Sequence, residues 1–201
     1  MTQQPQFRIV DITPAMLQEA ANLAYGFWKD ESDRGTPAQR VLLYQYLVHY
    51  YYHPESTMNI AVMEQGRLAA FILAQPALDR TTLEDAFLNT VSEQDDAWPL
   101  IMDYKAYLDG NQRLEDQAAE ASDVILSLFM SRRHGCGRML LEELQRRARQ
   151  GRFSRMILWT DDTCDYDYYP AHGFDLVLDC PIPHPFSITM HRTLLYSKPF
   201  G

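Results

Sequence analysis

Cysteine, positive charge and long apolar runs are all scarce in this 201-residue chain, and each scarcity excludes a class of protein. The three cysteines, Cys136, Cys164 and Cys180, are odd in number and stand in no zinc-like spacing. This pattern favours reduced thiols over a disulfide framework or a structural metal site. We therefore predict a protein that needs no metal.

Negative charge dominates, with 27 Asp and Glu against 18 Lys and Arg and a formal net charge of -9. A surface of this sign repels phosphate, so neither nucleic acid nor an anionic membrane is expected as a partner, and a cationic small molecule fits better. No stretch approaches the ~20 apolar residues of a membrane span. Residues 1–10, MTQQPQFRIV, lack the basic start and apolar core of a signal peptide. We expect a soluble, cytoplasmic protein.

The composition is that of an ordinary globular domain, 46% hydrophobic and 22% charged, so we predict one domain over residues 1–201. Residues 7–12, FRIVDI, predict a strand, and Thr13 and Pro14 after it predict a capped helix start. Residues 36–53 repeat this cap-then-proline pattern. Their apolar stripe predicts a helix face packed in the core, and its members are Leu42, Leu43, Tyr46, Leu47 and Tyr50.

The middle of the chain combines a hairpin with an acidic segment. Residues 58–63 and 68–75 flank a short loop containing Gly66, which predicts an antiparallel hairpin. Residues 84–123 then carry eleven acidic side chains against two basic ones, with apolar residues at helical intervals. We predict a helical insertion at about 80–121, made of two or three amphipathic helices, because the segment has too many aromatic residues for a disordered tail. Such an insertion would be a lid that attracts a cationic acceptor, a plain solvated face or an interface.

The second half predicts a strand-helix-strand unit. Residues 123–130, DVILSLFM, read as a strand buried on both faces, a helix follows as far as the C-cap Gly151, and residues 155–160 form a second buried strand. A short helix at 165–173 and strands at 174–178 and 187–195 complete the chain. This order predicts an α/β (α+β mixed) fold, whose central sheet of about seven strands is mixed, twisted and mostly antiparallel, with helices on both faces.

Two glycines, Gly135 and Gly137, lie where the first of these strands meets its helix, with three arginines within residues 132–138. Unpartnered N–H groups and the dipole at a helix N-terminus attract an anion, and glycine lets it come close. Arginines there oppose the dipole, which is unfavourable unless an anion compensates them. The spacing matches neither a dinucleotide fingerprint nor a P-loop. On these residues alone, a plain strand-to-helix turn stays equally open.

Residues 168–174, YYPAHGF, supply a second motif. Arg132-x-x-Gly135-x-Gly137 resembles the acyl-CoA pyrophosphate loop of the GNAT superfamily of N-acetyltransferases, Gln/Arg-x-x-Gly-x-Gly/Ala. YYPAHGF is similar to the Phe-Tyr-x-x-x-Gly-Phe that this family carries further along the chain. The resemblance is strong over residues 123–178, topological over 7–75 and absent over 81–120. It implies the GNAT-like acyl-CoA N-acyltransferase fold.

The resemblance also implies an activity and a site. The family uses acetyl-CoA to acetylate a primary amine of a small molecule or peptide by direct attack in a ternary complex. Tyr169 falls on the family's usual acid, a phenol of pKa ~10 that protonates the departing thiolate. The residues implied to hold acetyl-CoA are Leu128, Phe129 and Met130 on the strand, Arg132, Arg133, His134, Gly135, Cys136, Gly137 and Arg138 in the loop, and Asp162, which stands where the family often has Asn.

Some residues depart from the family or leave roles open. The connection from strand to glycines is shorter than usual, so a departure in cofactor geometry is expected around Met130. Cys136 lies at a helix N-terminus among arginines, a setting that lowers a thiol pKa, so a covalent acyl-cysteine route is a minor alternative. Asp123 and Glu120 are the nearest acidic candidates to accept the amine's proton, and a solvated carboxylate is the alternative for both.

Two other function classes stay open at this stage. One is a catalytically silent domain that binds acyl-CoA as a sensor or scaffold, although Tyr169 and both glycines of the loop are intact. The other is an interaction protein whose acidic insertion binds a basic partner. The sequence also leaves open a homodimer.

Overall fold

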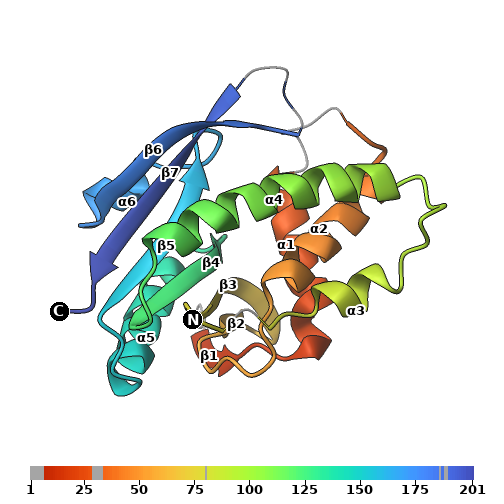
Figure 1. Ribbon diagram of the computed structural model, residues 1–201. Coiled ribbons are helices and arrows are strands. Elements are labelled where there is room, and N and C mark those ends of the chain that lie inside the picture. Colours follow the sequence, from red (N-terminus) through yellow and green to blue (C-terminus); the bar gives the residue numbers. More distant parts are fainter. Residues whose placement is uncertain (1–6, 29–33, 80, 186, 188–189) are drawn as a thin grey trace.

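A seven-stranded sheet forms the centre of the computed structural model (Figure 1), which describes residues 7–28, 34–79, 81–185, 187 and 190–201. The strands are β1 (Phe7–Asp11), β2 (Ile60–Glu64), β3 (Arg67–Pro76), β4 (Asp123–Ser131), β5 (Arg155–Asp161), β6 (Asp175–Pro183) and β7 (Met190–Pro199). Their order across the sheet is β1-β2-β3-β4-β5-β7-β6. Only β4 and β5 are parallel. The predicted mixed, mostly antiparallel sheet is confirmed, and the strand predicted at 187–195 lies partly outside the described residues.

Helices cover both faces of this sheet, as predicted. They are η1 (Pro14–Met16), α1 (Leu17–Trp28), α2 (Pro37–Tyr51), α3 (Glu84–Leu88), α4 (Trp98–Ala118), α5 (Cys136–Gln150) and α6 (Tyr168–Ala171). The buried residues of α1, α2 and α4 share one core with Leu128 and Met130 of β4, whereas those of α5 share a second core with Val124 and Leu126 of the same strand. Figure 1 shows α4 running across α1 and α2 towards β5.

Local sequence explains the start of α2 and the turn between β2 and β3. Thr36 and Gln39 form a capping box at the start of α2, with N–H to side-chain oxygen distances of 3.3 and 2.6 Å. Gln65 and Gly66 both have positive φ, 52° and 80°, in the two-residue turn that joins β2 to β3. Such a turn matches the twist of an antiparallel hairpin, so the predicted hairpin is confirmed. The side chain of Thr13, however, makes no cap hydrogen bond.

The end of α5 differs from the prediction in its backbone. Gly151 is the C-cap, but its φ of -75° is right-handed, and the left-handed residue is Arg152 with φ 62°. A Cβ on Gly151 would lie 2.6 Å from the ring of Phe153. Glycine is therefore needed there for the close approach of that ring.

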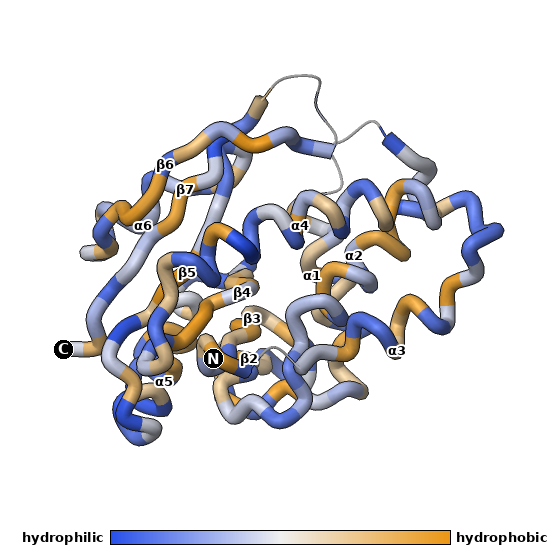
Figure 2. The backbone as a smooth tube through the Cα atoms, in the orientation of Figure 1, coloured by the Kyte–Doolittle hydropathy of each residue, from blue (hydrophilic) through white to orange (hydrophobic). Residues whose placement is uncertain are grey.

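The acidic segment forms two helices, α3 and α4, within the predicted two or three. Figure 2 shows hydrophilic and hydrophobic residues alternating along α4. Its apolar side is buried, at Leu100, Ile101, Tyr107 and Leu108, and packs against α2 and β5. Lys105 pairs with acidic groups on both helices. The insertion thus belongs to the core and is more than a solvated face.

Within the described residues, no helix combines the length and the apolar character that crossing a bilayer requires.

Candidate active site

The parallel strands β4 and β5 separate soon after they begin. They pair only at Asp123, Val124 and Ile125 of β4, although β4 continues to Ser131 and β5 to Asp161. Ser127 is an extra residue in the pairing of β4 with β3, because Leu128 faces Leu73 and Leu126 faces Ala74. This β-bulge lies beside the split and re-aims the strand. From Leu126 onward, the edge of β4 that faces β5 is left without a strand partner among the described residues.

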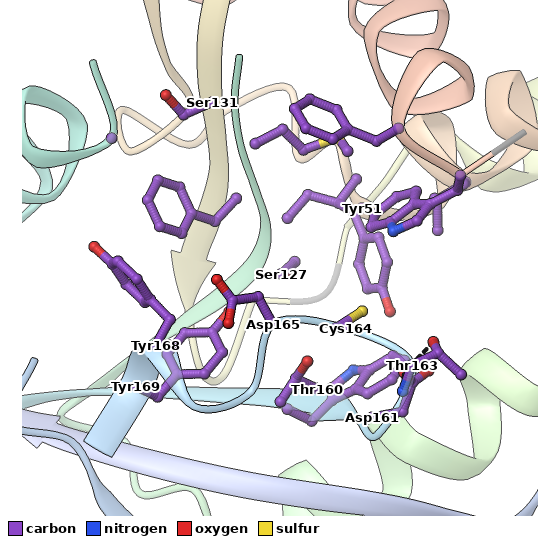
Figure 3. A pocket seen from close by; sticks show the side chains of 18 of the residues that line it. Tyr51, Ser127, Ser131, Thr160, Asp161, Thr163, Cys164, Asp165, Tyr168 and Tyr169 are labelled. Carbon is purple, nitrogen blue, oxygen red and sulfur yellow. Dashed lines mark hydrogen bonds between the residues drawn. The ribbon is translucent and has the colours of Figure 1, made fainter. Parts of the chain in front are cut away.

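A cavity of about 880 Å³ occupies the split. On the α5 side of the sheet, the cavity is lined by Phe129, the loop before α5 and residues of α6. On the other side, it is lined by residues of α1, α2 and α4. The cavity therefore connects the two faces between the parted strands. Figure 3 shows Ser127 near its middle, with Tyr168 and Tyr169 on one side and Tyr51 on another.

The loop before α5 presents free backbone donors. Cys136 N–H bonds to Arg133 O and Met139 N–H to Gly135 O. Within the described chain, the N–H groups of His134, Gly135, Gly137 and Arg138 donate to no protein acceptor. Unpartnered amides at the start of a 15-residue helix are a ready-made anion site.

The three arginines of this loop have partners of their own, which corrects the sequence interpretation. Arg133 forms a 2.7 Å ion pair with Glu64, Arg138 forms one with Glu142, and Arg132 donates at 2.8 Å to Leu68 O. Carboxylates therefore already pair with Arg133 and Arg138, and a backbone carbonyl holds the guanidinium of Arg132, so no bound anion is needed to explain the positions of these side chains. The side chain of Arg138 is 84% exposed, so its ion pair with Glu142 restrains it only weakly.

The two glycines serve different geometric purposes. Gly135 is the N-cap of α5 with φ 85°, a left-handed conformation in which a side chain is strained, while the space around it is open. Gly137 has an ordinary φ, but a Cβ there would lie 3.1 Å from Cζ of Phe129 and 3.5 Å from Cβ of Ser131. The first glycine shapes the turn, and the second lets α5 start close against β4.

Tyr169 lies in the cavity wall at the start of α6. Its ring stacks on Tyr196 at 5.3 Å and meets Phe174 edge-on at 5.4 Å. Burial raises the pKa of its phenol above the ordinary value, so the hydroxyl keeps its proton at neutral pH. Among the described residues, this hydroxyl donates to no protein group. Tyr168 beside it also lines the cavity and stacks on His172.

Ser127 adds a second hydroxyl that the sequence did not indicate. Its Oγ is buried and has no hydrogen-bond partner among the described residues. A buried hydroxyl without a partner is costly, so its persistence in a cavity wall suggests that a ligand completes it. The acceptor atoms of an acyl-CoA fit both places, since its thioester oxygen suits the Ser127 hydroxyl and its diphosphate suits the free amides of His134, Gly135, Gly137 and Arg138.

On the α1, α2 and α4 side, the cavity becomes an aromatic chamber, which we define by Trp28, Tyr44, Tyr51, Tyr104, Tyr107 and Trp159. Asp161, 6% exposed, lies at its base. Its carboxylate accepts hydrogen bonds from Tyr107 Oη at 2.6 Å, Thr163 N at 2.9 Å and Thr163 Oγ1 at 2.5 Å. These donors come from α4 and from the turn after β5, so distant segments fix one buried acid.

Most predicted site residues line this cavity, and two do not. Lining it are Leu128, Phe129, Met130, Arg132, Arg133, His134, Gly135, Gly137, Arg138 and Tyr169. Asp162 instead bonds to His191 Nδ1 at 2.8 Å on β7. Burial alone would raise its pKa, but hydrogen bonds with Arg192 and His191 lower it below the ordinary value. Asp161, the last residue of β5, lines the cavity, whereas Asp162 lies just beyond the strand and bonds to β7.

Cys136 is fully buried in the core beneath α5, and burial raises the pKa of its thiol. The expected lowering of the Cys136 pKa is therefore wrong, and the buried Cys136 thiol is not an accessible nucleophile for an acyl-cysteine route.

The two acids considered as proton acceptors also lie elsewhere. Asp123 is completely buried at the beginning of β4, where Arg155 binds it at 2.9 and 3.0 Å. Glu120 shares the same arginine at 3.5 Å. Neither lines the cavity, which is at the other end of the strand, so both assignments are corrected. Among the described residues, no group of three or more His, Cys, Asp and Glu could hold a metal ion.

Comparison with known proteins bears on the fold. No protein-family model matches the sequence, and no curated protein matches it significantly. Solved structures do match. The ribosomal-protein-S18-alanine N-acetyltransferase from Escherichia coli is 13% identical with a TM-score of 0.55, over 97% of this chain and 94% of that one. The C-terminal condensation domain of Ebony, in complex with beta-alanyl-dopamine, is 11% identical with a TM-score of 0.64, over 98% and 100%.

The polyamine N-acetyltransferase of Drosophila melanogaster is 10% identical with a TM-score of 0.57, over 96% of this chain and 100% of that one. Other matching structures include acetyltransferases of the GNAT family. The chain therefore has the GNAT acetyltransferase fold, as the two motifs predicted.

Proposed function

We propose that this protein is an acetyl-CoA-dependent N-acetyltransferase that acetylates a primary amine of a small molecule or peptide. The observation that carries the proposal is the continuous cavity through the β4–β5 split. It runs from the free amides of residues 134–138, past Ser127 and Tyr169, to the aromatic chamber. In such a cavity, a thioester that enters from the loop end and an amine that is bound in the aromatic chamber can meet at the split, beside Ser127 and Tyr169.

The residues at the loop end suit the diphosphate of coenzyme A. Four unpartnered amides supply hydrogen bonds, Gly137 keeps the helix start close, and the exposed Arg138 adds positive charge. The free edge of β4 around Leu128, Phe129 and Met130 offers backbone groups for the amides of the pantetheine arm. When bound, acetyl-CoA supplies an activated acyl carbon.

The chemical step is a direct transfer. The acceptor first loses a proton to water in the cavity, its nitrogen bonds to the acyl carbon, and the carbon–sulfur bond breaks. Tyr169 gives its proton to the departing sulfur, and the proton that the nitrogen sheds returns through water to the phenolate. The main catalytic contribution is the alignment of amine and thioester. Ser127, as a buried donor near the split, stabilises oxygen charge during the step.

Two measurements test this function. Acetyl-CoA and CoA at millimolar concentration should each raise the melting temperature, because a ligand that binds only the folded state stabilises it. Thiol release should then be followed across a broad panel of amines. Stabilisation by acetyl-CoA without turnover of any amine would favour the silent acyl-CoA sensor, and no stabilisation by either ligand would overturn both readings.

A further inference from the structure

We infer that the acceptor is a primary amine with a single positive charge and an aromatic body, bound with its ammonium at Asp161 and its ring in the aromatic chamber. This inference rests on the proposed function, because it names the substrate class of the same cavity. It depends on the chamber's own side chains and on no residue of the loop.

The first reason is the composition of the chamber wall. Trp28 stacks on Tyr44 with ring centroids 6.0 Å apart, and Tyr107 meets Trp159 edge-on at 5.7 Å. Burial raises the pKa of Tyr104 well above its ordinary value, and nearby Tyr44 adds to the rise. The chamber is therefore lined by neutral aromatic rings. Such rings favour another ring by offset or edge-on packing and also attract a cation.

The second reason is the placement of one acid in that wall. Asp161 is the carboxylate of the chamber among the described residues, since the other acid lining the cavity, Asp165, is exposed and lies beside Tyr168 and Tyr169. Three protein donors hold Asp161 in place, from Tyr107 and Thr163. A fixed carboxylate among aromatic side chains binds an ammonium well, because the low local dielectric of its buried position strengthens their attraction.

Together these features disfavour other amines. A polyamine carries several charges along its length and needs several acids, whereas the described chamber offers one. A small polar amine would leave the aromatic wall unfilled. An arylalkylamine places one charge a few bonds from one ring, which matches an acid at the base of an aromatic wall.

The test uses the full chain with acetyl-CoA and four amines: phenethylamine, 2-cyclohexylethylamine, ethanolamine and spermidine. We expect kcat/KM for phenethylamine to exceed the values for ethanolamine and spermidine by about tenfold or more. It should also exceed the value for 2-cyclohexylethylamine by a few fold, because a saturated ring lacks the π face that packs on aromatic side chains. If ethanolamine or spermidine reacts as well as phenethylamine, the inference is overturned while the proposed function stands.

Two variants locate the binding groups. Asp161→Asn keeps the shape of the side chain and should lower kcat/KM for phenethylamine about a hundredfold, with an unchanged KM for acetyl-CoA. Asp165→Asn is the matched control and should change kcat/KM less than threefold. Trp28→Ala, at a partly exposed position, should erase the preference for phenethylamine over ethanolamine even if the Asp161 variant fails to fold. An effect of Asp165→Asn alone, or an unchanged preference in Trp28→Ala, would refute the assignment.

Binding separates this inference from the proposed function. If no amine is acetylated, calorimetric titration of phenethylamine into the protein with CoA decides the matter. If phenethylamine binds and Asp161→Asn abolishes this binding, the amine site is supported and the transferase function is rejected. If phenethylamine does not bind, the amine site is rejected.

Discussion

The ring of Phe129 on β4 lies against the first turn of α5 so closely that a Cβ on Gly137 would come within 3.1 Å of it. Contacts this short force the neighbour to move by a few tenths of an ångström. Gly137, the second glycine of the loop, is therefore needed for the packing of α5 against β4. This contact couples the position of the free amides to the strand that borders the cavity.

Gly137→Ala should therefore weaken acetyl-CoA binding by about tenfold, because the added methyl group moves the helix start away from Phe129. Isothermal titration with acetyl-CoA measures the change. Gly135→Ala is the comparison, since its surroundings are open but its φ of 85° is strained for a side chain. It should lower the free energy of unfolding by about 1 kcal/mol. Unchanged affinity in Gly137→Ala would mean that these amides do not bind the diphosphate.

Tyr169→Phe should reduce kcat by about ten- to a hundredfold while leaving acetyl-CoA affinity unchanged, because only proton donation to sulfur is lost. Tyr168→Phe, next in the chain and also in the cavity wall, should stay within threefold. Steady-state kinetics with a good acceptor and titration with acetyl-CoA distinguish the two. Equal losses in both variants would assign the effect to packing.

The pH profile offers an independent check on Tyr169. Burial raises the pKa of this phenol above its ordinary value, so its acid form persists through the usual range of tyrosine ionisation. We expect no loss of kcat from this group between pH 8 and about 10. A fall in kcat with a midpoint below 10 that disappears in Tyr169→Phe would contradict this.

Ser127→Ala should separate stability from activity. Its buried Oγ has no partner among the described residues, so removing it should leave the free energy of unfolding unchanged or raise it by up to about 1 kcal/mol. The same change should lower kcat/KM about tenfold if the hydroxyl serves the reaction. Ser131→Ala is the control, because the Ser131 hydroxyl donates to Arg133 O at 3.0 Å and its loss should destabilise the fold slightly. Full activity in Ser127→Ala would exclude a catalytic hydroxyl.

The ion pairs of Glu143 on α5 should make the free energy of unfolding depend on pH. Hydrogen bonds from Arg146 and Arg147 lower its pKa from 4.5 to about 2, although burial acts in the opposite direction. A carboxyl whose pKa is lowered in the folded state stabilises the fold at pH values above its pKa in the unfolded state. This contribution is lost as the pH falls from about 4.5 towards 2.

Glu143→Gln should accordingly lower the free energy of unfolding by about 1 kcal/mol at pH 7 and by almost nothing near pH 2. Urea denaturation at several pH values measures this. The exposed pair of Glu142 with Arg138 is the matched control, and Glu142→Gln should cost less than 0.5 kcal/mol, roughly, at either pH. A loss for Glu143→Gln that does not shrink in acid would exclude the ion pairs as its cause.

Much of the fold could be predicted because its information is local. Two strand-like runs, 58–63 and 68–75, around a short loop with Gly66 predicted the β2–β3 hairpin, and the apolar run at 123–130 predicted β4 to within one residue. The glycine loop was recognised at a strand-to-helix junction, and Tyr169 and the other site residues were implied by the resemblance to the GNAT family; all but two of them line one cavity. Whether they bind acetyl-CoA stays a prediction.

Other features could not be read from spacing. The choice between Asp161 and Asp162 depends on how the chain leaves β5, because Asp161 lines the cavity and Asp162 bonds to His191 on β7. The thiol of Cys136 is buried, and this burial, together with Glu64, raises its pKa more than the charge of Arg133 lowers it. The charge of Arg133 is met by Glu64, which is 69 residues away in the chain.

The sequence by itself determined where strands, helices and the glycine loop lie, because propensity, capping and periodicity act over a few residues. Only the tertiary structure decided where β4 and β5 part, that the Ser127 hydroxyl is buried beside the split, and which acid lines the aromatic chamber. These depend on contacts among α1, α2, α4 and β5, whose positions in the chain are far apart. Packing of distant segments, which no local pattern encodes, brings one carboxylate and six aromatic side chains together.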